Sequence, residues 1–389
     1  MTRPTRIAHR MDGIEPFHVM DLLARARAME AQGRSVIHME IGEPDFATPE
    51  PIIEAGRRAL AEGHTHYTPA LGLPALRAAI AGFYEARYGL EIDPGRVVVT
   101  PGASGALQLL LAVLVDPGRK VLLSDPGYPC NRHLVRMVDG IPVSIPVDAS
   151  TGYQLRPEHI AAHWNADTVA AMVASPSNPT GTLLDAAQLA ALAESIFARG
   201  GHLIVDEIYH GLVYQDHPPT ALSVSDDIFV INSFSKYFGM TGWRLGWLIA
   251  PQAYIPALDR LAQNLFLAAP TPSQFAALAA FGDDSMAIME ARRREFQRRR
   301  DYLLPALREL GFSIDAEPAG AFYLYANATR FTDNSHAFAN RLLDEAGVAV
   351  TPGIDFGTHR AREYLRFAYT TGMPELEEGV ARITGFLER

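Results

Sequence analysis

The sequence predicts an α/β protein in which a doubly wound, mostly parallel sheet is accompanied by a smaller α+β domain. Two observations support this fold class. Across residues 46–285, short apolar runs alternate with amphipathic stretches of helical spacing, which is the pattern of βαβ units. The apolar runs end in turns rich in Gly, Pro, Asn and Asp, and sheets of this kind bind their ligands at such strand ends.

We expect three parts along the chain. Residues 1–45 form an N-terminal arm and part of the smaller domain, residues 46–285 form the large domain, and residues 286–389 complete the smaller domain. A chain of 389 residues with 48% hydrophobic content is long enough for more than one domain and a large core.

The spacing of apolar residues predicts the helices, and residues that stop helices mark their ends. The stretch Val19–Gln32 ends at Gly33, a good helix C-cap. The other helices that we expect are Pro51–Gly63, Leu73–Tyr88, Ala106–Val115, a long helical region from Tyr254 to about Leu310, Ser335–Ala346 and Glu375–Glu388.

Short apolar runs predict the strands, because strands of a parallel sheet are buried on both faces. Those expected before the C-terminal third are Ser35–Ile41, Arg96–Thr100, Val121–Ser124, Val169–Ala174, His202–Val205, Ile228–Ile231 and Leu245–Ala250. The C-terminal third adds Phe312–Asp315, Gly320–Tyr325 and Leu365–Ala368.

Composition argues against several classes of protein. The net charge is −10, so we interpret the two arginine triplets, at 292–294 and 298–300, as a solvated helix face rather than a nucleic-acid patch. The single cysteine, Cys130, allows no intramolecular disulfide and no cysteine metal cluster. There is neither a signal-peptide h-region nor an apolar stretch of membrane-spanning length. A cytoplasmic protein without a nucleic-acid or membrane partner is expected.

No metal site is expected either. His64 and His66 alternate along the chain, but they lack the nearby carboxylate or third ligand that a zinc site needs.

The distribution of lysine singles out one segment. Lysine occurs at two positions, 120 and 236, while arginine supplies the other positive side chains. Lys236 lies between two strand-like runs in the segment SFSKYFGMTGWR. A lysine amine can lose its proton when desolvated and attack a carbonyl, which arginine does not do. Amine chemistry at Lys236 is therefore indicated, with chance placement as the alternative on this segment alone.

Two other strand ends carry polar features. Gly102, Ala103 and Ser104 stand between a strand and a helix, a geometry that points free backbone N–H groups at an anion. Taken alone, this turn could equally be a tight βα connection, and it does not match GxxxxGK[ST]. Asp206 ends an apolar strand, where a carboxylate is costly unless it has a partner.

Together with the lysine segment, an ordered series of motifs resembles the class I/II aminotransferases, pyridoxal 5′-phosphate (PLP) enzymes of fold type I. The series covers almost the whole chain: GEPDFATP from Gly42, YTPALGLPALRAAI from Tyr67, PGASGAL from Pro101, DPGYP from Asp125, SPSNPTG from Ser175, DEIYHGLVY from Asp206, PAGAFY from Pro318 and YLRFAYTTG from Tyr364. Each motif alone is weak, and the series is specific.

The resemblance implies roles around the pyridine ring. Lys236 would form the imine with PLP and then serve as general base. Asp206 would keep the ring nitrogen protonated, and Tyr209 would hydrogen-bond the ring's phenolic oxygen. Tyr128 would stack on the ring, and Asn178 would face both the ring oxygen and the substrate carboxylate.

It also implies the residues that hold the two anionic groups. Gly102, Ala103 and Ser104 would form the phosphate cup with Ser233 and Arg244. Tyr67 would reach across a homodimer interface to the partner's phosphate, so that the subunits share their sites. Gly42 and Arg366 would bind the substrate α-carboxylate, since a guanidinium matches a carboxylate bidentately. Ala368 departs from the family, which usually has Ser there.

The expected activity is transfer of an amino group between an L-amino acid and a 2-oxo acid by a ping-pong cycle. C–S lyases and cyclopropane-forming synthases share these motifs, because a fold does not fix the reaction. A PLP-binding regulator is a remote alternative, because fewer than fifty residues precede the large domain.

We also expect neutral donors to be preferred over aspartate. Dicarboxylate-preferring relatives often carry lysine where this chain has Ser104. The site is expected to be lined by Phe17, Tyr128, Phe322 and Phe356. An arginine such as Arg10 could supply a missing cation.

Overall fold

The computed structural model, which describes residues 6–214 and 218–389, is built on one seven-stranded and one four-stranded sheet. The order of the larger sheet is β2-β8-β7-β6-β5-β3-β4. Its strands are β2 (Val97–Thr100), β3 (Lys120–Asp125), β4 (Ile141–Pro146), β5 (Thr168–Ala174), β6 (His202–Asp206), β7 (Phe229–Ser233) and β8 (Gly246–Ile249). β8 runs antiparallel to both of its neighbours, and the other pairs are parallel. The prediction of a mostly parallel sheet is confirmed.

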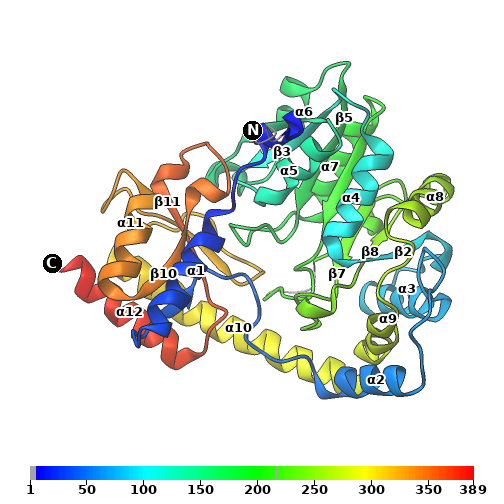
Figure 1. Cartoon of the computed structure of the whole chain (residues 1–389). Helices are drawn as coiled ribbons and strands as arrows, with labels where there is room; N and C mark the ends of the chain where they lie inside the picture. Colours follow the sequence, from blue (N-terminus) through cyan, green and yellow to red (C-terminus); the bar gives the residue numbers. More distant parts are fainter. Residues whose placement is uncertain (1–5, 215–217) are drawn as a thin grey trace, which may run out of the picture.

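Helices cover both faces of this sheet (Figure 1). One face packs against α4 (Gly102–Leu114), α5 (Pro129–Met137) and α8 (Ile255–Leu265). The other packs against α3 (Pro74–Tyr88), α6 (Pro157–His163), α7 (Ala186–Phe197) and α9 (Thr271–Leu278). Neighbouring strand residues join opposite layers, as Leu203 and Ile204 do, because side chains alternate across a strand. A sheet with helices on both faces is a doubly wound sheet, as predicted.

The four-stranded sheet combines the two ends of the chain. Its order is β1-β10-β11-β9, with bounds β1 (Ile37–Met39), β9 (Tyr323–Asn327), β10 (Val348–Pro352) and β11 (Tyr364–Ala368). β1 pairs in parallel with β10, so that Ile37 lies opposite Val348. The helices α1 (His18–Ala31), α11 (Ser335–Arg341) and α12 (Met373–Leu387) accompany this sheet, and a π-helical turn, Leu342–Ala346, follows α11. The predicted domain boundaries themselves stay a prediction.

A long helix connects the two sheets. α10 (Asp283–Leu310) runs from the region of α2 (Glu50–Ala61) and α9 toward the four-stranded sheet (Figure 1). Arg299 on this helix is 3% exposed and binds the Asp45 carboxylate through two hydrogen bonds of 2.9 and 3.0 Å. Arg292 stacks on Phe46, 5.1 Å from the ring centroid. The interpretation of the arginine triplets as a solvated face was therefore wrong for these two side chains, which fasten the crossing segment after Gly42.

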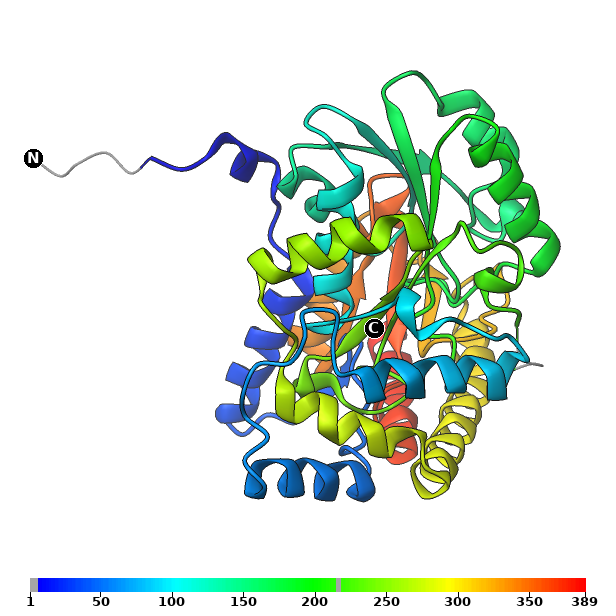
Figure 2. The ribbon, with the colours of Figure 1, turned by 90° about the vertical axis from the view of Figure 1, so that its right-hand side faces the viewer.

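The N-terminal arm leaves the body of the protein along α5. Figure 2 shows the segment before α1 projecting sideways from the body. Arg136 donates a hydrogen bond to the carbonyl of Gly13, and Arg10 pairs with Asp139 at 3.2 Å. Among the described residues, no helix combines the length and apolarity needed to cross a membrane.

Several element predictions need correction. α4 begins at Gly102 rather than Ala106, so the predicted phosphate turn is the first turn of the helix itself. The region after Tyr254 is three helices, α8, α9 and α10, because Gly and Pro interrupt it. Phe312–Asp315 is not a strand: Ser313 makes a single bridge with Asn327.

Candidate active site

A cavity of about 170 Å³ lies where the parallel strands of the large sheet end. Nine of the residues to which the sequence assigns a catalytic or binding role line it: Gly42, Ala103, Ser104, Tyr128, Asn178, Asp206, Tyr209, Lys236 and Arg366. They come from the N-terminal crossing, from successive strand ends of the large sheet, and from β11. The fold therefore brings together residues that are hundreds of positions apart in sequence.

Lys236 lies in the connection between β7 and the antiparallel β8. Its Nζ donates a hydrogen bond of 2.6 Å to the carbonyl oxygen of Gly42. Burial lowers the pKa of Lys236 to about 8, although the Glu43 carboxylate opposes the shift. An amine with this pKa is deprotonated in a useful fraction of molecules near neutral pH, as a nucleophile or general base requires.

Asp206 is the last residue of β6 and is 6% exposed. Burial raises the pKa of its carboxyl to about 6, against the effect of a 3.0 Å hydrogen bond donated by the Ile208 backbone. An acid held in this way is available to a cationic ligand group, since such a partner offsets the cost of desolvation.

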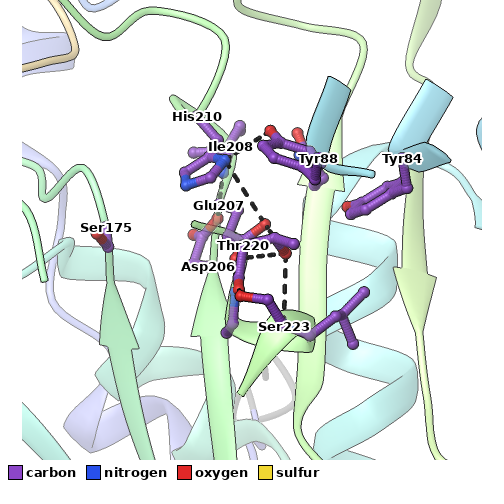
Figure 3. A network of polar contacts seen from close by, with 12 residues as sticks. Tyr84, Tyr88, Ser175, Asp206, Glu207, Ile208, His210, Thr220 and Ser223 are labelled. Atoms are coloured by element: carbon purple, nitrogen blue, oxygen red, sulfur yellow. Dashed lines mark hydrogen bonds and ion pairs between the residues drawn. The ribbon is translucent and has the colours of Figure 1, made fainter. Parts of the chain in front are cut away.

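The neighbouring acid, Glu207, belongs to a separate polar network (Figure 3). Its carboxylate accepts hydrogen bonds from the Thr220 hydroxyl at 2.9 and 3.0 Å and from the Ala221 N–H at 2.7 Å. The hydroxyl of Tyr88 lies 2.7 Å from Nδ1 of His210, which in turn is 3.9 Å from Glu207. Burial raises the pKa of Glu207 to about 8. This network supports the strand end that presents Asp206.

Arg366 projects from β11 and is 3% exposed. Its Nη1 donates to Oδ1 of Asn178 at 3.0 Å, and its Nη2 lies 3.2 Å from Oγ1 of Thr351. Within the described chain its buried Nε has no hydrogen-bond partner. A buried, unpaired N–H of a guanidinium is costly unless a ligand satisfies it, so an anion is expected there.

The glycine-rich turn lies beside Arg244. Gly102 has φ +73°, and a Cβ built on it would stand 2.7 Å from Nη2 of Arg244. A Cβ on Gly246 would meet the Ala103 nitrogen at 2.7 Å. Glycine at both positions thus permits a guanidinium and a helix N-terminus to converge, which suits a phosphate.

Four predicted residues are absent from the cavity lining: Gly102 and Arg244, described above, and Ser233 and Tyr67. The Ser233 hydroxyl is buried and bonded within its own turn, 2.9 Å from Oγ of Ser235 and 3.2 Å from the Leu245 carbonyl. Tyr67 is 82% exposed. Nothing in a single chain covers this tyrosine in the described structure.

The predicted apolar wall is partly wrong. Phe17 and Tyr128 line the cavity, whereas Phe322 and Phe356 are packed in the core at 0% and 1% exposure. Side chains of different origin complete the wall: Val19, Met20, Ile41, Leu107 and Ile208. The sequence reasoning also gave no role to Tyr323, which lines the cavity next to Tyr209. Arg10 binds Asp139 and is absent from the lining.

Comparison with known proteins identifies the family. The family model described as "Aminotransferase class I and II" matches residues 34–383. The chain belongs to this family. Its members depend on PLP, so the protein is a PLP-dependent aminotransferase.

Individual relatives match this aminotransferase over nearly its full length. The valine–pyruvate aminotransferase of Mycobacterium tuberculosis is 38% identical over 377 residues, 96% of this chain and 97% of the relative. An aspartate aminotransferase of Streptomyces avermitilis is 36% identical, with 99% and 98% covered. The crystal structure of an aminotransferase from Mycobacterium tuberculosis superposes with a TM-score of 0.95 at 38% identity, covering 99% of this chain and all of the other.

The site of the aminotransferase fits PLP. A desolvated lysine amine, a buried carboxyl and a glycine-lined helix N-terminus with an arginine suit an aldehyde, a pyridine nitrogen and a phosphate respectively. The family confirms both the predicted cofactor, PLP, and the predicted reaction class, transamination.

Proposed function

We propose that this aminotransferase prefers neutral amino donors, aromatic or aliphatic, and passes the amino group to a 2-oxo acid. The observation that carries the proposal is the cavity wall, where Phe17, Met20, Ile41 and Leu107 present apolar side chains. The cations of the described lining are Lys236 and Arg366, and each has a separate task. A second carboxylate buried there without a cation would cost several kcal/mol.

When bound, PLP supplies the electron sink that allows an amino group to leave one carbon and be passed to another. Asp206, Tyr209, Tyr128 and Asn178 hold its ring in this proposal. The cofactor phosphate is bound in this proposal by Gly102, Ala103, Ser104, Ser233 and Arg244, and by Tyr67 of a partner subunit. The support is the chemistry of these groups and the convergence of Gly102 and Arg244.

Lys236 moves the proton. Its Nζ, with a pKa lowered to about 8 by burial, is the group that would accept a proton from Cα of the amino acid and would later act as the acid that returns it. The hydrogen bond to the Gly42 carbonyl fixes the position of the amine between proton transfers. Burial in the small cavity favours the neutral amine over the ammonium form, and only the neutral amine can accept a proton.

Arg366 orients the substrate. Its Nε has no hydrogen-bond partner in the described chain, and its Nη1 donates to Oδ1 of Asn178. A substrate carboxylate bound by this guanidinium beside Asn178 would be held in a fixed plane, which leaves the side chain of the amino acid to face the apolar wall. Gly42 lines the cavity with backbone atoms alone, which leaves room for the substrate carboxylate beside Arg366 in this proposal.

We further propose a homodimer with shared sites, acting in a reducing compartment such as the cytoplasm. An aromatic side chain that is 82% exposed in one chain is more stable when another surface covers it. The opening bordered by Glu43, Thr241 and Arg244, of about 540 Å³, is large enough for such a side chain. The single cysteine fits the compartment.

The test is the steady-state kcat/KM for phenylalanine, alanine and aspartate, with pyruvate and 2-oxoglutarate as acceptors. We expect either neutral donor to exceed aspartate by roughly tenfold or more, since a well-fitted apolar group is worth about 1–3 kcal/mol. Aspartate ahead of both by tenfold contradicts the proposal. Release of well over one equivalent of 2-oxo acid per site without any acceptor would indicate a lyase instead, because the first half of the ping-pong cycle releases only one equivalent.

A further inference from the structure

Tyr323 occupies a junction between the two sheets at the active site. It is the first residue of β9, is 1% exposed, and lines the cavity. Three site residues from different parts of the chain contact it, namely Tyr209, Arg366 and Gly42. Its two chemical parts, hydroxyl and ring, face different partners.

The hydroxyl of Tyr323 lies 2.9 Å from the hydroxyl of Tyr209. Burial raises the pKa of both phenols, so both carry their protons. A phenol has one proton to donate. If Tyr209 donates its proton to the ring oxygen of PLP, its own oxygen must accept the proton of Tyr323, and the second hydrogen bond strengthens the first.

Gly42 holds this hydroxyl in place. A Cβ built on Gly42 would stand 1.9 Å from the Tyr323 oxygen, so the bare Cα of the glycine lies against it. The carbonyl of the same residue accepts the hydrogen bond from Lys236. The hydroxyl pair and the lysine amine are thus positioned by one residue.

The ring of Tyr323 supports Arg366. The guanidinium carbon lies 4.2 Å from the ring centroid, within the range of a favourable cation–π contact. The two residues stand on adjacent antiparallel strands, β9 and β11. The ring of Tyr323, together with that of Phe356 at 4.9 Å, therefore holds the guanidinium that faces the cavity, and the Tyr323 contact is the shorter.

We propose that Tyr323 is a positioning residue with two separable tasks: its hydroxyl orients the proton of Tyr209 toward the cofactor ring oxygen, and its ring holds Arg366 for the substrate carboxylate. The inference rests on the roles proposed above for Tyr209 and Arg366. It predicts that deleting the hydroxyl and deleting the ring have different signatures.

The hydroxyl is tested with Tyr323→Phe in the holoenzyme. The readout is the pKa at which the absorbance of the Lys236-bound cofactor changes with pH. A weaker donor leaves more negative charge on the ring oxygen, which favours the protonated form of the linkage, so the pKa should rise by about 0.5–1 unit. Affinity for 3-phenylpropionate, a carboxylate that cannot react, should change less than about twofold.

The ring is tested with Tyr323→Leu. Loss of the cation–π contact should weaken binding of 3-phenylpropionate about tenfold and raise KM more than it lowers kcat.

For the hydroxyl test, Tyr369→Phe is the matched control of Tyr323→Phe, because it removes a buried hydroxyl bonded to the Ala321 carbonyl at 3.2 Å, away from the cavity. Every variant keeps the charges that act on the Lys236 amine, which are Glu43, Arg366, Arg244 and Asp206.

A double variant shows whether Tyr323 acts through Tyr209. If it does, Tyr209→Phe with Tyr323→Phe shifts the absorbance pKa no further than Tyr209→Phe alone. Additive shifts, or equal shifts in Tyr323→Phe and Tyr369→Phe, overturn the inference. If the protein binds no PLP at Lys236, the proposed function is contradicted rather than the role of Tyr323, so the two proposals fail on different results.

Discussion

The amine of Lys236 and the backbone carbonyl of Gly42 are joined by a 2.6 Å hydrogen bond, although 194 positions separate them in sequence. The contact connects the crossing segment near the N-terminus with the turn between β7 and β8. Both residues are therefore direct targets for experiments on the site.

The first prediction concerns the identity of the reactive amine. Borohydride should trap PLP on Lys236 and leave Lys120 unmodified, because Lys120 is paired at 3.4 Å with Asp167 outside the cavity. Lys236→Ala should lose transamination by several orders of magnitude, since a covalent catalyst is removed. Peptide mapping after reduction decides the site, with Lys120→Arg as the control. Trapping on Lys120 would exclude this assignment.

The second prediction concerns the space next to Gly42. Gly42→Ala should lower kcat/KM by about a hundredfold, because its Cβ would collide with the Tyr323 hydroxyl and displace the carbonyl that binds Lys236. Gly82→Ala is the matched control: it lies in α3 with open space around it and should be neutral or stabilising by about 0.5–1 kcal/mol. An active Gly42→Ala enzyme would show that this close approach is dispensable.

The third prediction follows from the pKa of Asp206. Its carboxyl, with a folded-state pKa raised by burial to about 6 from 3.8, keeps its proton in the folded state after the unfolded chain has lost it. The contribution of Asp206 to the stability of the PLP-free protein should therefore fall as pH rises from about 4 to 6 and stay level above that. Asp206→Asn should remove this loss, so that the free energy of unfolding at pH 7.5 rises by up to roughly 3 kcal/mol. The same variant should lose its activity.

Urea unfolding of both proteins at pH 4.5 and pH 7.5, at one protein concentration, measures this difference. An asparagine variant that is less stable than the wild type at pH 7.5 would mean that the buried carboxylate is already compensated.

The fourth prediction concerns shared sites. Tyr67→Ala subunits mixed with Lys236→Ala subunits should form dimers in which one of the two sites has both intact residues. Free exchange then restores about a quarter of the wild-type sites. Lys236→Ala mixed with Asp206→Asn is the control, because both of these residues line the same cavity of one chain and no intact site can form. Restoration in neither mixture would argue that Tyr67 serves its own subunit.

The fifth prediction concerns substrate charge. Ser104 is exposed in the first turn of α4 and lines the cavity. Ser104→Lys should raise kcat/KM for aspartate about tenfold or more relative to phenylalanine, because it supplies a cation for the second carboxylate. Ser104→Met, of similar length without charge, should not. Equal ratios in both variants would show that this position does not meet the substrate side chain.

Sequence reasoning worked best where one strong local signal decided the outcome. Apolar runs such as Val169–Ala174 gave the buried parallel strands, and the motifs at their ends gave most of the cavity. It did not identify β4, where Pro142 and Pro146 break the apolar pattern. Proline is tolerated there because β4 is an edge strand of the sheet.

One of the remaining errors at the site came from strand orientation. Tyr323 faces the cavity, so its neighbour Phe322 must face the core, because side chains alternate. Which of the two faces the cavity depends on the register in which β9 pairs with β11. That register is set by contacts between distant parts of the chain, which the local sequence does not reveal. The contributions of Met20 and Ile41 likewise depend on how the N-terminal segment docks against the large sheet.

The pairing of β1 with β10 has a consequence for how this protein is made. Ile37 finds its partner, Val348, about 310 residues further along the chain. At a translation rate of roughly 5–20 residues per second, about 15–60 s pass between the two. During that interval Val19, Leu22 and Met39, all buried in the finished protein, have no sheet to cover them. The segment that contains β1 is therefore among the last to reach its final packing, and it stays open to chaperones and proteases while the rest of the chain is made.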